Sequence, residues 1–189
     1  MKLDIIGLDP SMSNFGLVKG VYDIETGKVE IRDMILTETK KGSNKQVRQN
    51  SDDLRRATEI VRASKHHIQQ ASVVFAELPV GSQSSRGQTN YGVCLGILAS
   101  IDKPLIQITP NQIKKLVGGK LTTSKQEVIE WAMERHPEAP WLTQKRKGET
   151  IVLGKNEHLA DAIAAIYVGL QEDQFRQLVD SLKNFIKVA

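Results

Sequence analysis

The chain has 189 residues, a length typical of one domain, and 40% of them are hydrophobic, which is enough for a sizeable core. Lysine and arginine total 26 against 22 aspartates and glutamates, so the net charge of +4 only weakly favours polyanionic partners. The single cysteine, Cys94, excludes an intramolecular disulfide. No apolar run approaches the roughly 20 residues of a membrane span, and the chain opens on a strand pattern without a signal peptide. We therefore expect a cytoplasmic protein.

Three strand patterns separated by short turns open the chain and predict an antiparallel meander. They cover Leu3–Leu8, Phe15–Tyr22 and Lys28–Thr37. The polar, basic stretch Lys40–Asn50 is predicted to be a loop. Helical spacing of apolar residues then begins at about Ser51, with Ser51 or Asp52 as the expected N-cap.

Strands and helices alternate in the rest of the chain. Strands are predicted over Ser72–Glu77 and Leu105–Ile108, and helices over Gln88–Ile101, from Pro110, over 125–135, over His158–Gln171 and over Glu172–Val188. The segment His136–Asn156 contains prolines, glycines and a basic run, and is predicted to be a loop. A meander followed by β-α-β units predicts one α/β domain over 1–189, with a mixed sheet, helices on both faces and a helical extension at about 172–189.

Four ionisable residues stand where apolar residues would be expected. Asp9 ends the first strand, Glu77 ends the fourth, and His158 and Asp161 share a face of the helix that follows. If strands one and four are neighbours, all four side chains meet at one edge of the sheet. Such a cluster needs a cation to limit its repulsion, and carboxylates are preferred ligands of Mg²⁺. Two such ions can activate a water and stabilise the leaving oxygen of a phosphodiester.

Each of these residues also has a purely structural explanation. Asp9 before a proline and a serine can form an Asx turn, and strand ends such as Glu77 are often polar. His158 and Asp161 can be a surface imidazole and a charge at the start of a helix. Asp4 and Glu157 are rival acidic candidates. We rank them lower because alternation turns Asp4 to the other face of its strand, and Glu157 is rotated by about 100° from its helical neighbour. The conjunction of four such positions favours a site.

Several motifs resemble those of the RuvC family of Holliday junction resolvases, within the RNase H-like superfamily. The opening I-I-G-L-D-P-S-M-S-N-F-G resembles the family's first motif, V-V-F-A-E-L-P its second acidic strand, and H-L-A-D-A-I-A-A-I its C-terminal helix. The segments G-Q-T-N-Y-G-V-C-L-G-I-L-A-S-I and I-T-P-N-Q-I-K-K-L-V-G-G-K-L-T-T-S-K-Q-E-V resemble the central helix and the basic DNA contacts. The resemblance spans roughly residues 3 to 170 and implies a mixed five-stranded RNase H-like sheet.

The resemblance also implies a catalytic and metal-binding set made of Asp9, Glu77, His158 and Asp161, which would hold two Mg²⁺ ions, with Mn²⁺ as a substitute. It implies a homodimer that cleaves branched DNA such as four-way junctions. Gly92 and Gly96 would allow close helix approach, either at a dimer interface or within the monomer. The residues expected to contact DNA are Lys114, Lys125, Arg86, Lys145, Arg146 and Lys147.

The sequence departs from the family pattern in three places. Val80 stands where family members often carry an aromatic wedge residue, residues 139–156 form a longer basic insertion, and an extra helix follows residue 171. Diverged relatives of this type occur in phages, some with broader specificity for branched DNA.

Two other functions fit parts of the pattern. An ATPase of the actin and sugar-kinase type shares the expected fold and has a similar first motif, but uses two such domains, for which the chain is short. A non-catalytic binder of branched DNA is the second alternative, against which the complete acidic set argues. We therefore expect a metal-dependent crossover junction endodeoxyribonuclease.

Overall fold

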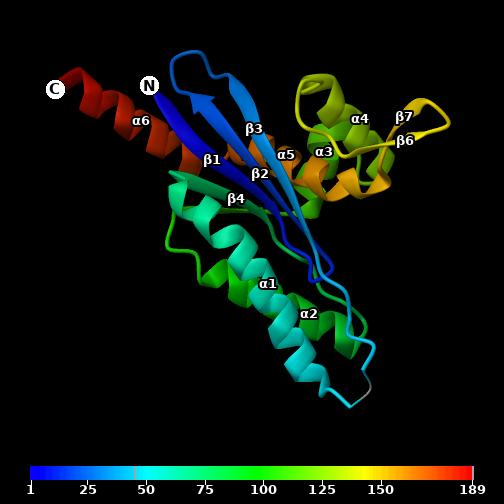
Figure 1. Ribbon diagram of the computed structural model, residues 1–189. Helices are drawn as coiled ribbons and strands as arrows, with labels where there is room; N and C mark the ends of the chain where they lie inside the picture. Colours follow the sequence, from blue (N-terminus) through cyan, green and yellow to red (C-terminus); the bar gives the residue numbers. More distant parts are fainter. Residues whose placement is uncertain (45, 189) are drawn as a thin grey trace.

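The computed structural model describes the backbone of residues 1–44 and 46–188, and the side chains of this range up to residue 185. Its centre is a five-stranded sheet with the strand order β3-β2-β1-β4-β5 (Figure 1). The strands are β1 (Lys2–Asp9), β2 (Asn14–Asp23), β3 (Val29–Glu38), β4 (Val73–Glu77) and β5 (Leu105–Ile108). The first three form the predicted antiparallel meander.

Strand β1 lies at the middle of the sheet and is parallel to β4, which is parallel to β5. The last pair between β1 and β4 is Leu8↔Ala76. Asp9 and Glu77 each follow by one residue, so the two acidic side chains leave the same edge of the sheet from adjacent strands. This register confirms the prediction that strands one and four are neighbours.

Helices cover both faces of the sheet, as predicted. They are α1 (Gln49–Gln70), α2 (Ser85–Ala99), α3 (Pro110–Gly118), α4 (Lys125–Arg135), α5 (Glu157–Gly169) and α6 (Asp173–Val188). Helices α1 and α2 lie on one face of the sheet and α3 to α6 on the other (Figure 1). Apolar residues of each group form a separate buried cluster with the sheet. Helix α5 packs directly on β1: a Cβ at Gly7 would lie 2.1 Å from the carbonyl oxygen of Ala162, so only glycine permits this approach.

Two predicted helix starts are wrong. Helix α1 begins at Gln49, and its N-cap is Arg48 rather than Ser51 or Asp52. Arg48 makes no side-chain capping hydrogen bond, so the usual serine or aspartate signal is absent there. Helix α2 spans Ser85–Ala99 instead of 88–101, because the hydroxyl of Ser84 accepts a hydrogen bond from the Gly87 N–H and starts the helix earlier.

The predicted loop at 136–156 is also wrong, because it contains a β-hairpin and a short 3₁₀ helix, Gly154–Asn156. Strands β6 (Thr143–Arg146) and β7 (Glu149–Val152) pair antiparallel in a separate two-stranded sheet. Lys147 and Gly148 connect them with φ values of 51° and 86°. Two consecutive positive φ values define the type I′ turn that suits a tight hairpin.

Helix α6 corresponds to the predicted extension, whose last residue, 189, lies outside the described part of the chain. Phe175 at its start is 1% exposed and packs edge-to-face against Tyr22 and Phe75 of the sheet. The extension is therefore attached to the core of the fold. Over the described residues, no helix has the length and apolarity needed to cross a bilayer.

Candidate active site

The edge of the sheet where β1 and β4 end is covered by the first turn of α5. There His158 Nδ1 lies 2.6 Å from Asp9 Oδ2, and both side chains are about four-fifths or more buried, at 15% and 16% exposed. Gly16, opposite Asp9 on β2, makes room for this contact. A Cβ at Gly16 would lie 2.5 Å from the carbonyl oxygen of His158. The sequence thus brings together two of its four predicted site residues in direct contact.

Glu77 and Asp161 complete the acidic cluster. Burial, together with the charges of Asp9 and Asp161, raises the pKa of Glu77 to about 8. Burial and the charge of Asp9 raise the pKa of Asp161 to about 7, although His158 and Lys125 act in the opposite direction. These shifts are large for carboxyl groups and show that three acidic groups share a poorly solvated space.

His158 carries more positive charge at neutral pH than an isolated histidine. Burial lowers its pKa, but the hydrogen bond with Asp9 and the charges of Asp9, Glu157 and Asp161 outweigh burial and raise the pKa above its ordinary value. The imidazole is therefore held in place by the acidic groups around it, and its protonated form partly neutralises them.

Glu157 lies closer to the site than the sequence suggested. Its Oε1 is 3.4 Å from His158 Nε2 and 3.0 Å from Lys125 Nζ. The position was ranked low because it is rotated from His158 on the helix, yet the glutamate side chain is long enough to reach the neighbouring imidazole and the ammonium group of α4. Asp4, the other rival, is exposed near the start of β1, at the far end of the strand from Asp9.

Two lysines that are predicted to contact DNA lie beside the acidic cluster, one on α3 and one on α4. Lys114 and Lys125 line a small pocket of about 160 Å³ together with Glu77 and Asp161. Their charges lower the pKa of Glu77, although not enough to offset burial and the neighbouring carboxylates. A pocket lined by two carboxyl groups and two ammonium groups can receive a phosphate with an accompanying cation.

The donor chemistry of the cluster fits a hard divalent cation. Within the described chain, no three His, Cys, Asp or Glu side chains lie close enough to coordinate one metal in their present positions. However, burial and neighbouring negative charge both disfavour ionisation of Glu77 and Asp161 and raise the pKa values of their carboxyl groups. A divalent cation removes that penalty, and oxygen ligands are those that Mg²⁺ prefers.

A buried polar network fixes the loop that follows Asp9. Arg56 on α1 is 4% exposed and donates to the Met12 carbonyl oxygen at 2.8 Å, to Ser13 Oγ at 3.2 Å and to Thr39 Oγ1 at 2.8 Å. A buried guanidinium with three acceptors makes this loop rigid.

The remaining predicted DNA contacts are spread over the molecule. Both terminal nitrogens of Arg86 donate to the carboxylate of Asp53 on α1, so this arginine fastens the start of α2 to α1. Lys145, Arg146 and Lys147 are exposed on the β6–β7 hairpin. Contact of these residues with DNA stays a prediction.

Solved structures with the same fold include the RuvC of T. thermophilus in complex with a Holliday junction substrate, at a TM-score of 0.59 and 17% identity, covering 93% of this chain and 96% of that one. The chain has the fold of RuvC. A second Thermus thermophilus RuvC structure gives a TM-score of 0.57 at 18% identity, covering 94% and 96%. The Fowlpox virus resolvase with its substrate Holliday junction DNA gives 0.52 at 17% identity, covering 95% and 98%.

This similarity confirms the predicted resemblance and the RNase H-like α/β architecture at the level of the fold. No protein-family model matches the chain, and a search of curated proteins found no match. The likeness therefore lies in the fold, since overall identity to the RuvC structures is below one fifth.

Proposed function

We propose that the chain is a metal-dependent, structure-specific endonuclease that cleaves four-way junctions or other branched DNA. The observation that carries the proposal is the convergence of Asp9, Glu77, His158 and Asp161 at one edge of a RuvC-type sheet. The neighbouring resolvase structures, which hold Holliday junction DNA, support branched DNA as the substrate class.

Asp9, Glu77 and Asp161 would hold the metal, which we propose to be two Mg²⁺ ions with Mn²⁺ as a substitute, and His158 would bind at the edge of the site. When bound, such ions activate a water for in-line attack and stabilise the departing 3′ oxygen, so that a 5′ phosphate remains.

The side chains of the site would prepare for this reaction in distinct ways. Asp9 would fix the orientation of the His158 ring through Nδ1, and Nε2, which lies 3.4 Å from Glu157 Oε1, would help to position the water. Lys114 and Lys125, at the pocket, would hold the phosphate that is cut. Arg86, Lys145, Arg146 and Lys147 would add phosphate contacts that set affinity without reading sequence.

We further propose a cytoplasmic homodimer in which two sites cut symmetrically related strands. Cys94 is a free, buried thiol whose pKa burial raises to about 11, which fits a protein that does not depend on disulfide chemistry.

The decisive experiment incubates the full chain with labelled four-way, three-way, flap and linear duplex DNA, with and without Mg²⁺. We expect cleavage of branched substrates only with the metal. Asp9→Asn and Asp161→Asn should each abolish cleavage, by at least about 100-fold, while binding of the junction persists. Asp4→Asn, an exposed substitution near the other end of β1, is the matched control and should retain full activity.

Three results would contradict the proposal. Metal-dependent cleavage by Asp9→Asn would contradict the assignment of Asp9 to the catalytic site. Tight junction binding without cleavage in Mg²⁺ or Mn²⁺ would support the non-catalytic binder instead. ATP hydrolysis without DNA cleavage would support the ATPase.

A further inference from the structure

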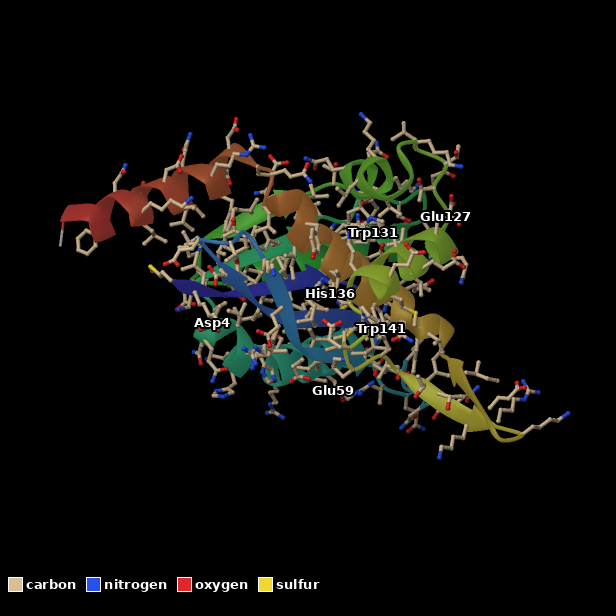
Figure 2. All side chains as sticks on the ribbon, turned by 90° about the horizontal axis from the view of Figure 1, so that it is seen from above. Asp4, Glu59, Glu127, Trp131, His136 and Trp141 are labelled. Atoms are coloured by element: carbon tan, nitrogen blue, oxygen red, sulfur yellow. The ribbon has the colours of Figure 1, made fainter. Side chains whose placement is uncertain are left out.

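The β6–β7 hairpin stands away from the body of the protein. All residues from 143 to 152 are exposed, and the two strands pair chiefly with each other (Figure 1). In the second view the hairpin again extends beyond the helices, past the labelled Trp141 (Figure 2). An isolated two-stranded hairpin is at best marginally stable in water, so this projection contributes little to the fold.

The base of the hairpin is nevertheless firmly attached to the candidate site. Asn156 is fully buried, and its carboxamide accepts a hydrogen bond from the Leu142 N–H at 3.0 Å and donates to the carbonyl oxygens of Leu142 and Leu153 at 2.8 and 2.9 Å. The Leu153 N–H donates to the Leu142 carbonyl at 2.9 Å. Asn156 precedes His158 by two residues, so the hairpin leaves the protein next to the first turn of α5.

The basic residues of the hairpin point in different directions. Residues directly opposite each other in an antiparallel pair lie on one face, and neighbours along a strand lie on opposite faces. Lys145 pairs with Thr150 and Arg146 pairs with Glu149, so Lys145 and Arg146 occupy opposite faces. Lys147 is in the turn at the tip. In the described part of the chain, none of these three cations forms an ion pair.

Cations on both faces of a ribbon suit a partner that is negative on both sides. A ribbon that lay flat on a single phosphate backbone would use only one of its faces, whereas a ribbon inside a DNA groove lies between two backbones. The major groove is about 12 Å wide and admits a two-stranded β-ribbon. A strand of four residues is about 13 Å long, which exceeds the groove depth of about 8.5 Å.

We propose that the β6–β7 hairpin inserts into the major groove of a duplex arm of the DNA substrate, with Lys145 and Arg146 contacting the two opposite phosphate backbones. This inference rests on the proposed function for the identity of the substrate, and it adds a second DNA-binding element beside the pocket at Lys114 and Lys125. The attachment through Asn156 gives the inserted ribbon a fixed direction relative to the cutting site.

The test measures binding of the full chain to a linear duplex and to a four-way junction in EDTA, over a range of salt concentrations. Log affinity falls with log salt, and each lost phosphate contact lowers the magnitude of this slope by about 0.9. We expect Lys145→Gln and Arg146→Gln each to lower it by about that amount, on both substrates, and the double variant by about twice as much. Lys28→Gln, in the exposed β2–β3 turn at the end of the sheet remote from Asp9, is the matched control and should leave the slope unchanged.

A second measurement reports on the groove itself. Guanine N7 faces the major groove, so wild-type protein should protect guanines of one duplex arm from methylation by dimethyl sulfate, and the double variant should lose this protection. A slope change for only one of the two variants would show flat docking on one backbone and overturn the proposal. An effect confined to the junction, or no loss of protection, would also overturn it.

These results separate the hairpin from the nuclease. Binding in EDTA does not require cleavage, so a chain that binds duplex DNA through both cations but cuts nothing would contradict the proposed function and support groove insertion. If the chain cuts branched DNA but both variants keep the salt slope of the wild type, the result would support the proposed function and contradict groove insertion.

Discussion

Two carboxyl groups of the candidate site make the stability of the protein depend on pH. Glu77 and Asp161 have folded-state pKa values of about 8 and about 7, above their ordinary values of 4.5 and 3.8. At a pH between the ordinary and the folded-state pKa of each group, the folded state binds more protons than the unfolded state. The free energy of unfolding therefore falls as pH rises, and this decrease is complete above about pH 8.

Replacing Glu77 with glutamine should therefore flatten this pH dependence. Even one unit of pKa shift corresponds to about 1.4 kcal/mol, or about 3 °C in melting temperature for a chain of this size. From pH 5 to pH 8.5, the melting temperature of Glu77→Gln should thus fall by at least about 3 °C less than that of the wild type. Glu134→Gln, an exposed change on α4, should follow the wild type. Parallel curves of melting temperature against pH for the wild type and Glu77→Gln would show that the pKa of the Glu77 carboxyl group is not raised.

The same carboxyl groups predict how the protein responds to metal. At pH 8 a divalent cation that binds only the folded state raises the melting temperature as its concentration rises. Millimolar Mg²⁺ should stabilise the wild type, and Asp161→Asn and Glu77→Gln should each lose most of this gain. Thermal melting with and without Mg²⁺ checks this independently of any cleavage assay, and equal stabilisation of all three proteins would place the metal elsewhere.

At the scale of elements, the position of α5 depends on glycines in the sheet. Gly16→Ala would place a methyl group 2.5 Å from the His158 carbonyl oxygen, a backbone atom that cannot move without the helix. We expect a loss of about 1–3 kcal/mol in stability and a larger relative loss of cleavage, because His158 shifts away from Asp9. Gly154→Ala is the control, since a Cβ there meets nothing within 4 Å. Urea unfolding and cleavage rates of both variants measure these effects, and wild-type behaviour of Gly16→Ala would refute this account of how α5 is placed.

The sequence predicts the elements that bury a periodic face and misses those that do not. Strands β1 and β4 are recognised by their apolar runs, and the acidic residues that end them are members of the predicted site. All residues of the β6–β7 hairpin are exposed, so its sequence has no alternation of buried and exposed positions. The only local cue is Gly148, which suits the positive φ of a hairpin turn. The Glu157–Lys125 contact and the Arg86–Asp53 pair depend on side-chain reach between elements distant in sequence, which no local pattern contains.

At the scale of the whole molecule, we predict that α2 forms the interface of the proposed homodimer. The sequence left open whether Gly92 and Gly96 serve packing within the monomer or between monomers. A Cβ at either position meets nothing within 4 Å in the described chain, which excludes the first role there. Leu95 beside them is 44% exposed. Because the two glycines are one helical turn apart, they form a smooth strip on which another helix can pack closely.

A charged side chain on this strip should therefore separate the predicted homodimer without harming the fold of each chain. Gly96→Glu replaces a poor helix former, and its Cβ meets nothing within 4 Å in the described chain, so a well-folded monomer is expected by circular dichroism and by mass in solution. Gly154→Glu, also in open space but outside α2, should keep the mass of the wild type. The separated chain should nick a four-way junction once instead of cutting two symmetric strands, since paired cuts require both sites on one substrate. A wild-type chain that is monomeric at micromolar concentration, or a Gly96→Glu chain that remains dimeric, would exclude α2 as the dimer interface.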